Sequence, residues 1–221
     1  MLDMSACWTA QPIAVIDTET CGLDPADGIC EIAVVRIEAM HVVSSWSSLV
    51  KPNKPIPEAA TKIHGIRDAD VAGAPSLPEL AGELLKRCVD AVPCAYSSDF
   101  DMAFLRAQIA GTDCAAFDPA FTTWVDPLTV VRDVDRWQKG PGRHRLENVC
   151  RRWGVTLSAA HRARGDAEAT AGLLLKLHEV DKLPAMPLGQ LLARIAARKA
   201  AQQRDFDQWK ARQPPRQGEA S

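Results

Sequence analysis

The chain has 221 residues, of which 47% are hydrophobic and 24% charged, as is typical of a globular protein with one main domain and an appendage. The formal net charge of −2 argues against a protein that coats nucleic acid regardless of its sequence. Seven cysteines without a C-x-x-C pair give no indication of a zinc site or a disulfide framework. No signal peptide and no apolar run of roughly 18 residues is evident, so we expect a cytoplasmic protein that does not contact a membrane.

After a lead-in of little pattern over residues 1–11, hydrophobic periodicity, caps and breakers predict a series of regular elements. In chain order these are strand 13–20, strand 28–37, strand 41–50, helix 57–63, helix 77–89, strand 91–96, helix 98–109, strand 122–125, helix 127–134, helix 146–153, helix 166–180 and helix 188–209. The short link between the second and third strands favours an antiparallel hairpin. The order of elements predicts an α/β or α+β fold with a mixed five-stranded sheet flanked by helices.

Residues 12–183 are expected to form the main domain, 184–212 a C-terminal helix, and 213–221 a disordered tail rich in proline and polar residues. The C-terminal helix carries an apolar stripe at helical spacing, and two roles for it stay open. It could cover the core of its own domain, or it could, with the tail, dock a polymerase or another partner.

The first predicted strand ends in two carboxylates, Asp17 and Glu19, two residues apart. Because side chains alternate along a strand, the two point to the same face. Buried carboxylates on one face repel each other and lose hydration, and a divalent cation with a preference for oxygen ligands would remove both penalties. A metal site is one interpretation, and a pair that begins a solvated turn is the other.

Three further residues have ordinary explanations when each is taken alone. Asp101 and Asp166 each fall near the start of a predicted helix, where the helix dipole favours an acidic side chain. His161 lies in the preceding loop, and a lone histidine is more often a surface or structural residue than a base. Taken together with Asp17 and Glu19, and in their order along the chain, these three residues form a recognisable set of motifs.

The motifs D-x-E, F-D-x-x-F-L and H-x-A-x-x-D-A, in this order, resemble those of the DEDDh (DnaQ-like) 3′→5′ exonucleases, a branch of the ribonuclease H-like fold. The matching segments are 16–23, 63–66, 100–105, 144–155 and 161–167. A histidine five residues before the last aspartate matches the histidine subgroup, because position 162 is arginine where the sister subgroup has tyrosine. The sequence is similar in particular to the proofreading (epsilon) subunits of bacterial DNA polymerase III.

This resemblance implies that Asp17, Glu19, Asp101 and Asp166 bind two Mg²⁺ or Mn²⁺ ions. His161 would act as the general base toward the attacking water. The implied reaction removes nucleoside 5′-monophosphates from a 3′ end, with single-stranded DNA favoured. An RNA-directed enzyme similar to ribonuclease T or oligoribonuclease is an alternative, and a non-catalytic nucleic-acid-binding module on the same fold is another.

By the same resemblance, Thr18, Leu23 and His64 would contact the 3′-terminal nucleotide, although a strand residue, a turn residue and a helix-terminal histidine are the plain alternatives. Candidates for phosphate contacts are Lys139, Arg143, Arg145 and Arg162, for which a solvated basic loop is an equal alternative. Ser97 stands where the family often has asparagine, a departure that bears on substrate preference more than on activity.

Overall fold

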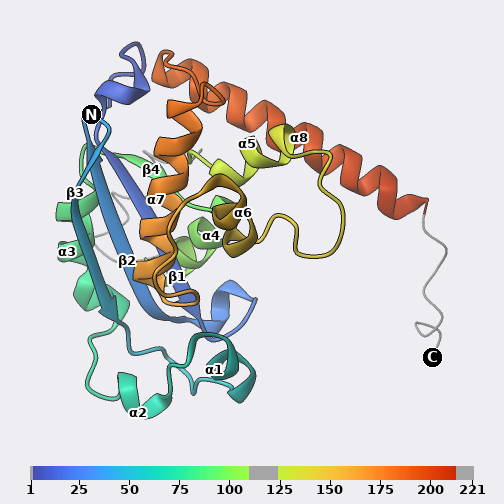
Figure 1. The fold of residues 1–221 in the computed structure, drawn as a ribbon. Coiled ribbons are helices and arrows are strands. Elements are labelled where there is room, and N and C mark those ends of the chain that lie inside the picture. Colours follow the sequence, from blue (N-terminus) through green and yellow to red (C-terminus); the bar gives the residue numbers. More distant parts are fainter. Residues whose placement is uncertain (1, 110–123, 213–221) are drawn as a thin grey trace.

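A four-stranded mixed sheet forms the centre of the computed structural model, which describes residues 2–109 and 124–212 (Figure 1). Its strands are β1 (Ile13–Thr20), β2 (Ile29–Glu38), β3 (His41–Leu49) and β4 (Val92–Cys94), in the spatial order β3-β2-β1-β4. β1, β2 and β3 pair antiparallel, and β4 pairs parallel with β1. The mixed α/β class predicted from the sequence is confirmed.

The sheet has four strands in the part of the chain that the structure describes, and the prediction of five is corrected. Residues 122 and 123 of the expected fifth strand lie outside the described ranges. Val125 makes only an isolated parallel bridge with Cys94. The chain cannot continue as a strand beyond this bridge, because Asp126 caps a helix that begins at Pro127.

The predicted helices are present with small shifts at their ends. The helices are α1 (Glu58–His64), α2 (Asp68–Val71), α3 (Leu77–Cys88), α4 (Ser98–Ile109), α5 (Pro127–Val134), α6 (Leu146–Trp153), α7 (Ala163–Glu179) and α8 (Leu188–Ala211), with short 3₁₀ turns η1 (Trp8–Ala10) and η2 (Pro25–Asp27). Ser76 and Glu79 form the capping box that begins α3, and Gly154 in the left-handed conformation ends α6. The one-turn helix α2 was not predicted.

The alternation of side chains along β1 divides the core into two layers. Ile13 and Val15 belong to the cluster that packs against α7, which lies across the sheet in Figure 1. Ala14 and Ile16 belong to the cluster on the other face, with side chains of α3 and α4. Asp17 and Glu19 continue the α7 side of this alternation, and the prediction that they share one face is confirmed.

The first half of α8 covers the core, because Leu188, Leu191 and Ile195 are each 0% exposed. The N-terminal lead-in packs beside it: Trp8 is buried and its indole Nε1 donates to the Pro184 carbonyl at 3.0 Å. Beyond Ile195 the helix passes α5 and extends away from the sheet (Figure 1). The division at residue 184 stays a prediction, and the tail 213–221 lies outside the described residues. Within the described ranges, no helix is long and apolar enough to cross a membrane.

Candidate active site

Three of the predicted carboxylates meet where β1 ends and α7 begins. Asp17 and Glu19 come from β1, and Asp166 comes from the first turn of α7. Each offers one carboxylate oxygen, and these oxygens all lie within 4.8 Å of one another. This spacing is suited to ligands of one cation.

The fourth predicted carboxylate, Asp101, approaches from α4 and is 3% exposed. Thr18 donates its hydroxyl to Asp101 Oδ1 at 2.8 Å, which links the helix to β1. The negative charge of Asp101 also raises the pKa of Asp17, so the two groups interact. We refer to Asp17, Glu19, Asp101 and Asp166 as the acidic cluster.

Burial raises the pKa of every member of the acidic cluster. The pKa of Glu19 rises to about 8, that of Asp101 to about 7 and that of Asp166 to about 6, in each case chiefly through loss of hydration. The pKa of Asp17 is raised well above its ordinary value, through burial and then through the charges of its neighbours. A divalent cation that prefers oxygen ligands would stabilise the ionised form of all four, so the donor set fits such an ion.

His161 lies beside the acidic cluster, in the loop that leads into α7. Its backbone is in the left-handed region with φ of 59°, and its N–H donates to Asp166 Oδ2 at 3.1 Å. The side chain is exposed, and its ring has no hydrogen-bond partner within residues 2–109 and 124–212. The imidazole is therefore free to face a molecule bound at the cluster.

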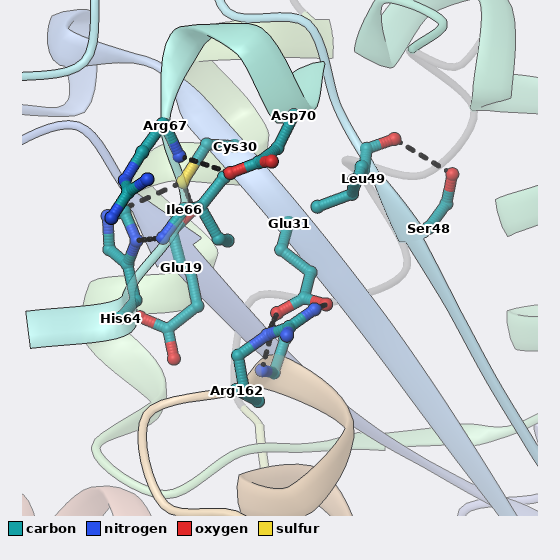
Figure 2. Close-up of polar contacts among 11 residues, drawn as sticks. Glu19, Cys30, Glu31, Ser48, Leu49, His64, Ile66, Arg67, Asp70 and Arg162 are labelled. Carbon is teal, nitrogen blue, oxygen red and sulfur yellow. Dashed lines mark hydrogen bonds and ion pairs between the residues drawn. The ribbon is translucent and has the colours of Figure 1, made fainter. Parts of the chain in front are cut away.

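An ion pair between buried Glu31 and half-exposed Arg162 fixes the backbone that follows His161 and was not predicted from the sequence (Figure 2). Glu31 on β2 is 3% exposed and accepts two hydrogen bonds from the Arg162 guanidinium, at 3.0 Å and 2.6 Å. The same carboxylate accepts the N–H of Ala163, the first residue of α7, at 3.0 Å. The signal in the sequence was an acidic residue inside the apolar run of β2. Arg162, a candidate phosphate contact, is thus engaged within the protein.

The predicted nucleotide contacts lie around the end of β1 in different settings. Thr18 is 7% exposed and bonded to Asp101, whereas Leu23 is 87% exposed in the turn after β1. His64 is buried at the end of α1, where Nδ1 accepts the Ile66 N–H at 3.0 Å and Nε2 lies 3.7 Å from Cys30 Sγ (Figure 2). Burial lowers the pKa of His64, which favours the neutral ring.

The loop before α4 depends on a second unpredicted residue, Asp126. Ser97 has φ of 65°, a left-handed conformation that asparagine adopts more readily than serine. Asp126 compensates by accepting the backbone N–H groups of Ser97 and Ser98, each at 3.2 Å, and it also caps α5. Lys199 from α8 contacts Asp126 at 3.1 Å. This network fixes the start of the helix that carries Asp101.

Comparisons with known proteins identify the family of the chain. The model of the family described as Exonuclease matches residues 14–174. The "DNA polymerase III subunit epsilon-like protein" of Rhodobacter capsulatus is 36% identical over 169 residues, which are 74% of this chain and 23% of that protein. This chain therefore spans about a quarter of that relative's length.

Solved structures are similar in fold. Exonuclease X in complex with 5′ overhanging duplex DNA has a TM-score of 0.59 and 24% identity, covering 81% of this chain and 99% of that one. The nuclease domain of 3′hExo, a DEDDh family member bound to rAMP, has a TM-score of 0.64 and 16% identity, covering 76% of this chain and 92% of that one. With its family model matched over most of its length, the chain belongs to the exonuclease family, on the fold of the DEDDh exonucleases.

Proposed function

We propose that the protein is a metal-dependent 3′→5′ exonuclease that releases nucleoside 5′-monophosphates from DNA 3′ ends. The observation that carries the proposal is the convergence of four carboxylates, buried Asp101 from α4 and three half-buried ones from β1 and α7, beside an exposed histidine. Buried like charges are costly for stability, and in a member of the exonuclease family a cation-dependent reaction explains why they are present.

The acidic cluster would hold two ions, Mg²⁺ or Mn²⁺. When bound, such ions lower the pKa of an attacking water and stabilise charge on the leaving oxygen. His161 would take the proton of that water, since its ring is exposed and its backbone is hydrogen-bonded to Asp166. Arg162 and Glu31 would keep this loop in place without touching the substrate.

We assign the 3′-terminal nucleotide to the surface around the end of β1. Leu23, as an exposed apolar side chain in the turn after β1, would pack against the terminal base. Thr18 would offer its backbone, because its hydroxyl is already bonded to Asp101. His64, being buried with both ring nitrogens engaged, would support this surface from beneath.

The test follows the products of single-stranded oligonucleotides that carry a label at the 3′ or the 5′ end, incubated with Mg²⁺, with Mn²⁺ and with chelator. A 3′ label should appear at once as a mononucleotide, while a 5′ label should pass through a ladder of shorter strands. DNA and RNA oligonucleotides of the same sequence, tested side by side, decide the preferred sugar. Faster cleavage of the RNA oligonucleotide would identify the protein as an exoribonuclease.

Two variants and their matched controls locate the activity. Asp17→Asn and His161→Asn should lower the rate by about 10³-fold and 10²-fold, because they remove a metal ligand and the base. Asp181→Asn and His41→Asn change the same residue types outside the site and should leave the rate of mononucleotide release unchanged. No mononucleotide release by the unmodified protein, or equal release by Asp17→Asn, would overturn the proposal.

A further inference from the structure

A groove of about 1200 Å³ separates the far half of α8 from α5 and from the glycine-containing loop before α6. In Figure 1 these three segments lie together on the side of the molecule away from β3. No member of the acidic cluster lines the groove, so it is a separate feature of the surface.

The groove is lined by positive charge that the protein itself does not neutralise. Arg132 and Arg136 come from α5 and the turn after it, and Arg143 and Arg145 come from the loop before α6. All four are exposed, and none has a carboxylate partner within the ranges that the structure describes. Exposed arginines in a concave surface favour an anionic ligand.

The acidic residues along the groove are largely compensated already. Lys199 Nζ lies 2.6 Å from Asp99 Oδ1 and 3.1 Å from Asp126 Oδ2. Asp205 is the remaining carboxylate of the lining. The arginines therefore dominate the charge that a ligand would meet.

The α8 side of the groove presents two aromatic rings. Phe206 and Trp209 stack with their centroids 5.9 Å apart, and they are 53% and 56% exposed. Exposed aromatic rings beside arginines are the combination that binds single-stranded nucleic acid, whose bases stack on the rings while its phosphates meet the basic side chains.

The inner end of the groove lies at the start of α4, the helix that carries Asp101 of the acidic cluster. Ser97 lines the groove and immediately precedes α4, on which Asp101 lies one helical turn further along. Lys199 also donates to Ser98 Oγ at 2.7 Å, which holds α8 against this point. Tyr96 donates to the His144 carbonyl at 2.6 Å and holds the basic loop on the other side.

We propose that the groove binds the nucleic-acid strand upstream of its 3′ end, with Arg143 and Arg145 on phosphates and Phe206 and Trp209 on bases. The proposal rests on the proposed exonuclease function, because that function places a 3′ end at the acidic cluster. It gives the projecting half of α8 a role in selecting long single strands over short ones.

The first experiment measures binding apart from cleavage. In the Asp17→Asn background, fluorescence anisotropy of 5′-labelled single-stranded oligonucleotides of 2, 6 and 12 nucleotides should show affinity that rises with length. Arg143→Gln combined with Arg145→Gln should weaken 12-mer binding at least 10-fold and reduce the slope of log K against log salt by about 1.4, because each phosphate contact on a single strand contributes roughly 0.7. Trp209→Ala should weaken it at least 5-fold.

Arg204→Gln is the control for the arginines and Val43→Ala the control for an exposed apolar side chain, since both residues are exposed and do not line the groove. In the active protein, the groove variants should hydrolyse dinucleotides at the unmodified rate and lose the preference for 12-mers. Unchanged 12-mer affinity and length preference in both groove variants would overturn the proposal and leave the groove to a protein partner. Binding through these residues without any hydrolysis would support the groove and count against the exonuclease instead.

Discussion

Replacement of Glu31 should uncouple the position of His161 from the rest of the site. The Glu31 carboxylate holds Arg162 by two hydrogen bonds and the N–H of Ala163 by a third. In Glu31→Ala the buried N–H loses its acceptor, at a cost of about 1–3 kcal/mol. The ion pair adds less than a fully buried one, because the Arg162 side chain is 49% exposed and water can replace the carboxylate.

These contributions together predict that Glu31→Ala unfolds about 2–4 kcal/mol more easily when Mg²⁺ is present to suppress repulsion within the acidic cluster. For a chain of this size, that loss lowers the melting temperature by roughly 5–15 °C. Glu31→Gln keeps an oxygen for Ala163 but cannot pair with the guanidinium, so its loss should be intermediate. Urea unfolding followed by circular dichroism measures the free energy of unfolding of both variants.

The effect on catalysis should exceed the effect on folding. A displacement of the histidine by about 1 Å lowers the rate of the chemical step by on the order of 10²-fold. We expect Glu31→Gln to lower kcat at 20 °C, far below its melting temperature, with little change in KM and a shifted pH–rate profile. Glu38→Gln breaks the exposed Arg36–Glu38 pair on the same strand and serves as control, with an expected change within about 0.5 kcal/mol.

A double-mutant cycle separates positioning from general destabilisation. Arg162→Met alone and combined with Glu31→Gln should show strongly non-additive losses in kcat, because both remove one interaction. Unchanged kcat in a folded Glu31→Gln protein, or additive losses in the cycle, would show that Glu31 does not position His161.

Three further predictions concern the acidic cluster and α8. Asp17→Asn should lower activity by about 10³-fold yet stabilise the metal-free protein by about 1 kcal/mol or more, measured by thermal melting with chelator, because it removes a half-buried carboxylate from among like charges. The folded-state pKa values of Glu19, about 8, and Asp166, about 6, lie above the unfolded values near 4, so the metal-free protein should lose stability as pH rises from about 4 to about 8. Mg²⁺ should flatten that dependence, and a slope unchanged by Mg²⁺ would argue against binding at the cluster. Deletion of residues 184–221 should leave the protein insoluble, because it exposes the core that α8 covers and removes buried aliphatic side chains that each contribute about 1.5–3 kcal/mol to stability. Deletion of 204–221 should leave the melting temperature nearly unchanged.

Local signals in the sequence were sufficient for most of the fold. The alternation along β1 predicted correctly that Asp17 and Glu19 share a face, and the Ser76 cap predicted the start of α3. The start of α7 was predicted at Asp166 but lies at Ala163, since the N–H of Ala163 is accepted by Glu31 from a strand more than a hundred residues away. A cap supplied from another element leaves no trace in the neighbouring sequence.

The same distinction applies to the site. Asp17 and Glu19 could be predicted to lie together because their spacing along one strand is local, whereas Asp101 and Asp166 were assigned through the resemblance of their motifs to those of the family. The partners of Arg162 and Ser97 could not, because Glu31 and Asp126 reach them only after the sheet and helices have packed. The apolar stripe of α8 and the length of the helix were predicted, but only the structure shows that the stripe covers the core of the same domain.

The contacts between the lead-in and the start of α8 bear on how the chain reaches its native state. The Ala6 carbonyl accepts the N–H of Leu188, and the backbones of Cys7 and Pro187 pair in an isolated antiparallel β-bridge. A chain that emerges from the ribosome N-terminus first has no partner for residues 2–8 until nearly all of the domain has been made. Such distant pairing is costly in loop-closure entropy and slows folding. We expect the contacts between residues 2–8 and the start of α8 to form last during synthesis. Buried Trp8, in a variant whose other five tryptophans are replaced, offers a fluorescence probe of that step.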